Sequence, residues 1–575
     1  MASGMAQAEI KKPRFIIAPM IEGQGYCKAG LAESNIGAAI AYCASNHDFG
    51  TKELASALNQ LEPNGAKGAV QIGYTVGVNL LENTEDGKFN PFGFLTKSLD
   101  SIDRPAVIYI FANHFAGITA RPPITDDAMA RFADQSIPSE TYFNAKIAPI
   151  SLSTDAGLLI NQQRSKALQK MGDWYKSLPK KSKDKIIAFT MAGELHHFYD
   201  DFSTGMGKFE NIHVTDYRPA SIFDFQGWLE NNYNNIGSFN KKLGTEFKNF
   251  NEVKPPSKNI QSDRLENFSQ HFDSFSHGIV PIEGWLEKLP PKHKIQIYLN
   301  GISLGEAVYG LNRQDVYESS EKFKSAQLGF RYLLDFSKLP RGKYTVQVMV
   351  EGVRGYELAR RSLSIMGQSQ EPIKDFGRAL RVKKSSKHPE RFYLDRPANE
   401  IPLFYNPLAR DWLKFRSEQV TKAYEHWLDA SKAVGLPAEK LFSHQIAVAT
   451  VGGWNPVLFA SDASLQGTQR YKKGINLYGG SASMALLQKY YLKPGEIFGV
   501  PEFHSQAWKD PKAPGKVLKD LQSGGAIFVS PYFLSMVPDK YRTKPNAHDK
   551  FRISPHNKDY GSNHLYLAIA AMATK

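Results

Sequence analysis

The feature of this chain that most constrains its fold is a regular alternation of short apolar runs and helix-like stretches. The run at 105–111 (PAVIYIF) is rich in β-branched residues and apolar on both faces, a pattern typical of parallel strands covered on both sides. Amphipathic stretches such as 219–233 separate the runs. We expect eight strands, at 14–20, 68–80, 105–111, 185–191, 441–448, 474–478, 496–500 and 525–533.

Eight strand–helix units predict a (β/α)8 TIM barrel in the α/β class. The alternative is a doubly wound open sheet, which normally has fewer strands and a phosphate-binding loop. The sequence contains neither GxGxxG nor GxxxxGK[ST] and therefore favours the barrel. A long helix is expected at 407–434, because Asn406 precedes Pro407 in the cap-then-proline order that begins many helices.

Between the fourth and fifth units the rhythm changes to that of antiparallel strands. Asn300-Gly301 follows the run KIQIYL and is a strong hairpin signal, and a second turn separates LGFRYLLDF from YTVQVMV. We expect a small antiparallel β-sandwich at 284–368, inserted between two parts of the barrel at 1–283 and 406–575, with a basic polar linker at 369–405. Its role is open: it could extend a substrate groove, or serve as a spacer or dimer contact.

The chain is basic, with 71 Lys and Arg against 57 Asp and Glu and a net charge of +14. Such a charge favours polyanions, which include nucleic acids, acidic lipids and acidic polysaccharides. We expect no nucleic-acid partner, because no reading helix or stacking platform accompanies the basic residues. Two interpretations stay open for a basic cluster within the linker, namely a solvated surface and contact with an acidic glycan. The cluster consists of Arg378, Arg381, Lys383, Lys384 and Lys387.

The composition, with 42% hydrophobic and 22% charged residues, excludes long disorder, fibrous repeats and a disulfide scaffold. The two cysteines, Cys27 and Cys43, form no CxxC pair, which argues against a thiolate zinc site. A disulfide between them is the alternative to our prediction of two buried free thiols. No apolar run reaches the roughly 20 residues of a membrane-spanning helix.

The first residues lack the apolar core of a signal peptide. The Ala-Gln-Ala at 6–8 would suit the surroundings of a removed signal. We therefore expect a secreted or periplasmic protein, with a cytoplasmic one as the alternative.

Two glutamates are the strongest candidates for catalysis. TIM-barrel enzymes carry their chemistry at the carboxyl ends of the strands, and Glu194 and Glu502 follow the fourth and seventh predicted strands. Both carboxyl groups are therefore expected to face a substrate at the same rim. Glycosidases use such a pair, with one group protonated because ionising two neighbouring carboxyls is costly. The alternative is a pair of solvated loop residues.

The segment 214–256 resembles a known family. It holds an F-x-x-W-L helix formed by Phe225, Trp228 and Leu229, then Tyr233, Gly244-Thr245 and Pro255-Pro256. This pattern, together with the helix at 406–425, resembles the stretches around the fourth and fifth strands in family 42 β-galactosidases, which are clan A glycoside hydrolases. The resemblance implies that Glu194 is the acid/base and Glu502 the nucleophile.

The chain departs from this family at Gly193, where the family has an asparagine. That asparagine hydrogen-bonds the hydroxyl next to the anomeric carbon. The departure argues against a plain β-galactosidase. It would leave room for a bulkier substituent or another ring, or it would mark a chain that no longer catalyses.

Further polar and aromatic residues at the predicted rim are candidates for substrate binding. Aromatic faces pack against the C–H face of a pyranose, and imidazoles hydrogen-bond its hydroxyls. In the clan, a tyrosine at the position of Tyr478 often hydrogen-bonds the nucleophile. Core packing or a structural hydrogen bond is the alternative for each candidate. They are Asn113, His114, His196, His197, Tyr478, His504, Trp508 and Tyr532.

The sequence thus predicts a retaining hydrolase of β-glycosidic bonds whose partner is a poly- or oligosaccharide, an acidic one if the basic charge reflects the substrate. We expect neither a metal nor another cofactor, because His196 and His197 lack the HExxH spacing. Two alternatives stay open. One is a transglycosylase with the same residues, and the other is a non-catalytic glycan-binding protein on a barrel that has lost its activity.

Overall fold

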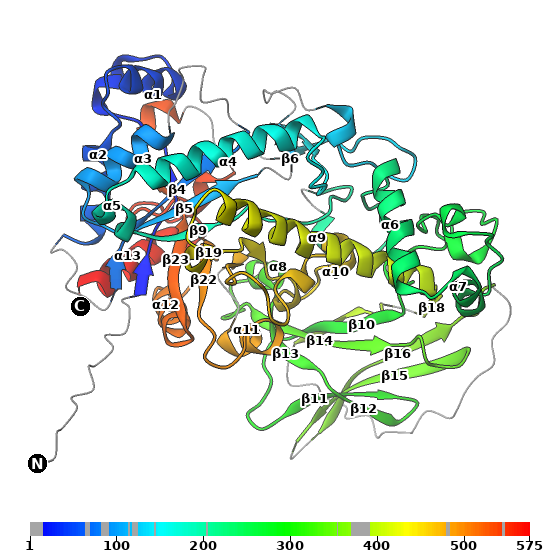
Figure 1. The fold of residues 1–575 in the computed structure, drawn as a ribbon. Helices are drawn as coiled ribbons and strands as arrows, with labels where there is room; N and C mark the ends of the chain where they lie inside the picture. The colour runs from blue at the N-terminus through cyan, green and yellow to red at the C-terminus, as the bar shows by residue number, and fades with distance from the viewer. Residues whose placement is uncertain are drawn as a thin grey trace, which may run out of the picture.

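The computed structural model describes residues 15–63, 70–81, 91–112, 115–117, 125–142, 145–202, 205–352, 355–369, 391–398, 400–478, 483–542 and 547–574 (Figure 1). Parallel strands with covering helices form one part of the molecule. Antiparallel strands gather at the other end, away from α1 (Ile36–Ser45) and α2 (Thr51–Leu61) (Figure 1).

Two four-stranded parallel sheets form the first part. One has the order β22–β23–β1–β3 and the other β19–β9–β5–β4. Most residues of these strands are apolar and buried, as the continuous apolar runs predict, and β5 is the clearest case. The strands are β1 (Phe15–Ile17), β3 (Val70–Ile72), β4 (Tyr74–Asn79), β5 (Ala106–Phe111), β9 (Ile186–Thr190), β19 (Leu441–Phe442), β22 (Phe498–His504) and β23 (Ala526–Tyr532).

Shorter parallel pairings connect the two sheets. The Thr75 amide donates to the Pro19 carbonyl at 2.8 Å, which links the chain after β1 to β4. On the other side, β20 (Gln445–Ile446) pairs with β21 (Ile475–Asn476), and Leu477 bridges to Phe503 of β22. A further pair joins β2 (Ile21–Glu22) to β24 (Leu534–Ser535). Closure of these sheets into a TIM barrel stays a prediction.

Helices alternate with these strands. The longest, α9 (Pro407–Ala433), is capped by the Asn406 side chain, which accepts from the Leu408 amide at 3.0 Å. This helix ends one residue before the predicted limit at 434. The helices of this part are α1 (Ile36–Ser45), α2 (Thr51–Leu61), α3 (Pro91–Ser101), α4 (Leu159–Ser177), α5 (Lys180–Lys185), α6 (Pro219–Asn232), α7 (Ile236–Leu243), α9 (Pro407–Ala433), α10 (Pro456–Phe459), α11 (Met484–Tyr490), α12 (Ala513–Ser523) and α13 (Ser562–Thr574). None of the helices described is long and apolar enough to cross a membrane.

The antiparallel part consists of two sheets, β13–β14–β10–β17 and β12–β11–β15–β16–β18, which share one apolar core. The hairpin predicted at Asn300-Gly301 joins β11 to β12, with positive φ at both turn residues. The elements are β10 (Ile279–Leu286), β11 (Lys294–Leu299), β12 (Ile302–Glu306), β13 (Val308–Asn312), α8 (Gln314–Glu318), β14 (Gln327–Asp335), β15 (Gly342–Glu351), β16 (Tyr356–Ile365), β17 (Phe392–Arg396) and β18 (Ile401–Leu403).

The limits of this part differ from the predicted sandwich at 284–368. Its first strand begins at Ile279, and β17 and β18 lie within the range predicted as a linker. They belong to the sheets because β17 pairs with β10, and β18 with β16. The basic cluster of the predicted linker, residues 378–387, lies outside the described residues. A smaller antiparallel sheet contains β6 (Phe115–Gly117), β7 (Glu140–Tyr142) and β8 (Ala145–Pro149).

Cys27 and Cys43 form a disulfide, with their Cα atoms 5.8 Å apart, so the prediction of two free thiols is wrong. The bond joins the 3-10 helix Lys28–Ala32 to α1. These elements approach closely at Gly30, where a Cβ would lie 2.7 Å from the Ala39 carbonyl oxygen. This backbone contact brings the two cysteines together across a separation of 16 residues.

Candidate active site

Glu194 lies just beyond the carboxyl end of β9, after a sharp turn. Ala192 and Gly193 both have positive φ, at 67° and 85°. The Gly193 carbonyl accepts from the buried hydroxyl of Tyr424 at 2.7 Å, which ties this turn to α9. The turn is therefore fixed by a hydrogen bond from a residue far along the chain.

The Glu194 carboxyl is held by two donors on one oxygen. Its Oε1 accepts from Asn476 Nδ2 at 2.7 Å and from the Tyr478 hydroxyl at 2.5 Å. Burial raises the pKa of Glu194 to about 8, with a further contribution from the negative charge of Glu502. The carboxyl is accordingly protonated at neutral pH. Because Oε1 already accepts two hydrogen bonds, its proton belongs on Oε2.

Glu502 lies in β22 and has the opposite protonation state. Its Oε1 accepts from His504 Nε2 at 2.7 Å, and its Oε2 from His444 Nε2 at 3.3 Å. Burial alone would raise the pKa of Glu502, but the hydrogen bonds from His444 and His504 outweigh it and hold the pKa well below the usual value. Glu502 is thus a partly buried carboxylate, 14% exposed, whose oxygens each accept from one imidazole.

His444 is oriented by contacts on both sides. Its Nδ1 lies 3.2 Å from Thr190 Oγ1, and its ring stacks on that of Tyr109 with centroids 3.9 Å apart. Burial lowers the pKa of His444, so the ring is neutral. A neutral imidazole that accepts from Thr190 through Nδ1 must carry its hydrogen on Nε2, where it can donate to Glu502.

The hydroxyl of Tyr109 occupies the space beside Gly193. A Cβ built on Gly193 would lie 2.8 Å from this oxygen. Burial, with a smaller contribution from the negative charge of Glu502, raises the pKa of Tyr109, so its hydroxyl keeps its proton beside the two carboxyl groups. The space that the family resemblance assigns to an asparagine side chain is therefore filled by a tyrosine from β5.

A cavity of about 530 Å³ adjoins Glu194. Glu194 lines it but Glu502 does not, so the cavity lies on the side of the protonated carboxyl. Three of the predicted binding residues, His196, Tyr478 and His504, line it together with Phe202, Trp454 and Phe459. His196 stacks on Phe202, and burial lowers the pKa of His196 to about 4, so this histidine is neutral.

The other predicted binding residues are distributed differently. Tyr532 stacks on His504 at 4.7 Å and shares a 2.8 Å hydrogen bond with His548, so it supports the cluster around Glu502. His197 is buried and bonds the Arg416 carbonyl at 3.1 Å, away from the cavity lining. Trp508 packs in the core and lines a separate cavity of about 360 Å³. Asn113 and His114 lie outside the described residues.

The structure brings three residues to the carboxyl pair that the sequence analysis missed, namely Tyr109, His444 and Asn476. His444 and Asn476 stand inside the fifth and sixth predicted strands, whereas most of the predicted site residues lie at or beyond the strand ends. The sequence signal that could have identified His444 and Asn476 is a polar residue within an otherwise apolar strand. Tyr478 also differs from the clan pattern, because it donates to Glu194 and not to the expected nucleophile Glu502.

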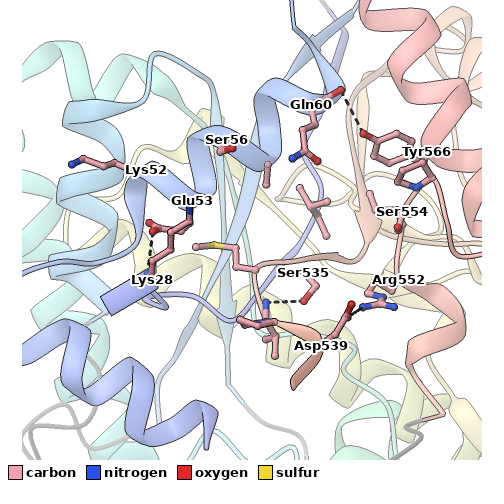
Figure 2. A pocket seen from close by; sticks show the side chains of 17 residues that line it. Lys28, Lys52, Glu53, Ser56, Gln60, Ser535, Asp539, Arg552, Ser554 and Tyr566 are labelled. Carbon is pink, nitrogen blue, oxygen red and sulfur yellow. Dashed lines mark hydrogen bonds and ion pairs between the residues drawn. The ribbon is translucent and has the colours of Figure 1, made fainter. Parts of the chain in front are cut away.

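A second cavity of about 530 Å³ contains none of the predicted site residues (Figure 2). It lies between α2, α13 and the chain after β24, and Figure 2 shows Arg552 paired with Asp539 at its edge. Its charged side chains are exposed or half-buried, and their recorded contacts are with other protein groups. It carries no constellation of reactive groups comparable to that at Glu194.

Among the described residues, no group of three or more His, Cys, Asp and Glu side chains is placed to hold a metal ion. Comparison of the chain with protein-family models and with curated proteins finds no match.

Proposed function

We propose that this protein is a retaining glycoside hydrolase that cleaves β-glycosidic bonds, with Glu194 as acid/base and Glu502 as nucleophile. The observation that carries the proposal is the contrasting hydrogen bonding of the two carboxyl groups: Glu194 accepts from Asn476 and Tyr478 and has a pKa raised to about 8, whereas Glu502 accepts from two imidazoles, which hold its pKa low. Glycosidases need this division between a proton donor and a carboxylate, and the resemblance of 214–256 to clan A enzymes favours the retaining double displacement.

In the first step, Oε2 of Glu194 gives its proton to the glycosidic oxygen while Glu502 attacks the anomeric carbon, and the leaving group departs as an alcohol. Loss of this proton leaves a carboxylate that Asn476 and Tyr478 stabilise. In the second step, Glu194 takes a proton from water as the water attacks the same carbon. This releases Glu502 and yields the sugar with retained configuration.

The proposal includes the TIM barrel as the scaffold. Its support is the cyclic order of parallel strands, in which β3 and β4 are successive segments of the chain, as are β19 and β20. The pairings are β1–β3, β4–β5, β5–β9, β9–β19, β20–β21, β22–β23 and β23–β1, and a bridge from Leu477 to Phe503 joins the chain after β21 to β22. In such a scaffold the two glutamates stand at the carboxyl ends of strands four and seven. The antiparallel sheets of 279–403 are then an insertion between strands four and five.

We propose a carbohydrate as the partner and a secreted or periplasmic location. Aromatic rings of Phe202, Trp454 and Phe459 line the cavity beside Glu194, and such rings pack against sugar C–H faces. The Cys27–Cys43 disulfide supports the location, because disulfides persist mainly in oxidising compartments. The net charge of +14 favours a substrate with acidic groups.

The test is hydrolysis of 4-nitrophenyl β-glycosides, namely galactoside, glucoside, N-acetylglucosaminide, glucuronide, fucoside and arabinoside, followed by azide rescue. Glu194→Ala should be rescued to a β-glycosyl azide, because azide attacks the intermediate. Glu502→Ala should give the α-azide, because azide replaces the nucleophile. Glu230→Gln, on the exposed face of α6, is the matched control and should leave the rate unchanged. Rescue of both variants to the same anomer would overturn the assignment of roles.

A further inference from the structure

The antiparallel part of the chain contributes a wall to the cavity beside Glu194. Asn312, at the end of β13, and Gln314 and Asp315, in α8, line it. These residues belong to the part of the chain that holds the antiparallel sheets, whereas Glu194 and Tyr478 belong to the parallel part, so the two parts together line the cavity.

Hydrogen bonds fix this wall against the loop after β20. The Gly452 amide donates to the Asn312 carbonyl at 2.8 Å, and Arg331 Nη2 donates to the Val451 carbonyl at 3.0 Å. Arg331 is itself held by the buried carboxylate of Glu283 at 2.7 Å. A wall held by backbone hydrogen bonds and a buried ion pair keeps its position without a ligand.

α8 is anchored from a second direction by the C-terminal part of the chain. The Lys509 amide donates to the Tyr317 hydroxyl at 2.9 Å, and the Tyr560 hydroxyl donates to Glu318 at 2.5 Å. The segment 312–318 is therefore held on two sides, and its cavity-facing residues keep a fixed distance from Glu194.

The Asn312 side chain indicates that the cavity takes a polar ligand. It is only 3% exposed, and among the described residues its Oδ1 has no hydrogen-bond partner. This oxygen is shielded from solvent, so a ligand hydroxyl meets it only after the amide, which lines the cavity, turns; a buried acceptor without a partner is costly, and satisfying it favours that turn. In the same cavity, Trp454 is half-buried and stacks on Phe459 at 5.5 Å. An amide acceptor and an aromatic face together match a sugar ring, which carries hydroxyls on its rim and C–H groups on its face.

The position of the cavity indicates on which side of the scissile bond the bound sugar lies. A leaving group departs on the side of the group that protonates it. Glu194, the protonated carboxyl, lines the cavity, and Glu502 does not. We propose that Asn312 and Trp454 form a subsite for the sugar on the leaving-group side of the scissile bond, so that the inserted sheets select the substrate. This inference rests on the proposed function, and it assigns the protein to oligosaccharides with a sugar as leaving group.

The test compares two substrates with the same first sugar. One is the 4-nitrophenyl β-glycoside that the wild type cleaves, and the other is the matching disaccharide, which is lactose for galactose and cellobiose for glucose. Asn312→Leu should lower kcat/KM for the disaccharide about tenfold more than for the aryl glycoside, because only the disaccharide offers hydroxyls to Oδ1. Trp454→Leu should give the same selective loss, and it covers the case in which Asn312→Leu does not fold.

Asn234→Leu, an exposed amide between α6 and α7, is the matched control and should affect both substrates equally little. Equal losses on both substrates, or no loss on either, in the Asn312 and Trp454 variants would overturn the subsite. If the wild type cleaves no glycoside, the proposed function fails, and calorimetric binding of lactose and cellobiose decides the subsite separately. Binding that Asn312→Leu abolishes would support it, and binding that is absent or unchanged would overturn it.

Discussion

A Cβ atom built on Gly193 would lie 2.8 Å from the hydroxyl oxygen of Tyr109, at a backbone φ of 85°. Tyr109 cannot easily move away, because its ring is stacked on His444 and packed against Phe111, each with a centroid distance of 3.9 Å. The residue before Glu194 is therefore restricted to glycine by both conformation and space.

Gly193→Ala should accordingly destabilise the protein by about 1–3 kcal/mol and lower kcat/KM about tenfold or more, because strain in the turn displaces Glu194. Thermal unfolding and aryl glycoside hydrolysis measure the two effects. Gly227→Ala is the matched control. It lies in α6 with nothing within 4 Å of the added Cβ, and it should stabilise the helix by about 0.5–1 kcal/mol. An unchanged melting temperature for Gly193→Ala would contradict the restriction.

The basic limb of the pH–rate profile should report Glu194. The proton donor is lost as pH rises through the pKa of about 8, so kcat/KM should fall above that pH. The Tyr478 hydroxyl donates to Glu194 and lowers its pKa, so Tyr478→Phe should move the basic limb to higher pH. Tyr490→Phe, at the end of α11, is the control. A shift to lower pH in Tyr478→Phe would refute the protonation states assigned here.

The acidic limb should report Glu502. Hydrogen bonds from His444 and His504 hold its pKa low, so the nucleophile stays ionised well into the acidic range. His444→Phe keeps a ring to stack on Tyr109 but removes the donor, so the pKa of Glu502 should rise and the acidic limb should move to higher pH. His444→Gln, which retains an N–H donor, should recover part of the shift. A rate loss without any change in the profile would indicate a packing role only.

The strand positions were predictable because they depend on local sequence. Continuous apolar runs predicted strands at 105–111, 185–191 and 525–533, and the structure has β5, β9 and β23 there. The start of α9 followed from Asn406 and Pro407 in the same way. These signals need no knowledge of distant residues.

The partners of the two glutamates depend on contacts between distant residues. Asn476 reaches Glu194 across 282 residues, and His444 reaches Glu502 across 58. Only the arrangement of the strands brings them together, so the sequence could name the carboxyl groups and the donors Tyr478 and His504 at the predicted rim, but not Asn476 and His444. β17 was not predicted for a related reason. It comes after a long polar stretch of the sequence, and it is a strand because it pairs with the distant β10.

The disulfide should contribute measurably to stability. It closes a loop across a separation of 16 residues, and constraining the unfolded chain in this way stabilises a fold by about 3 kcal/mol. Dithiothreitol should therefore lower the melting temperature of the wild type. The Cys27→Ser/Cys43→Ser double variant should start from that lower value and be insensitive to the reductant. Titration of free thiols tests directly whether the bond forms. Because both sulfurs are buried, this titration must be done on the unfolded chain. Two free thiols in the unreduced wild type would show that the bond does not form, whereas none is expected because Cys27 and Cys43 are the protein's two cysteines.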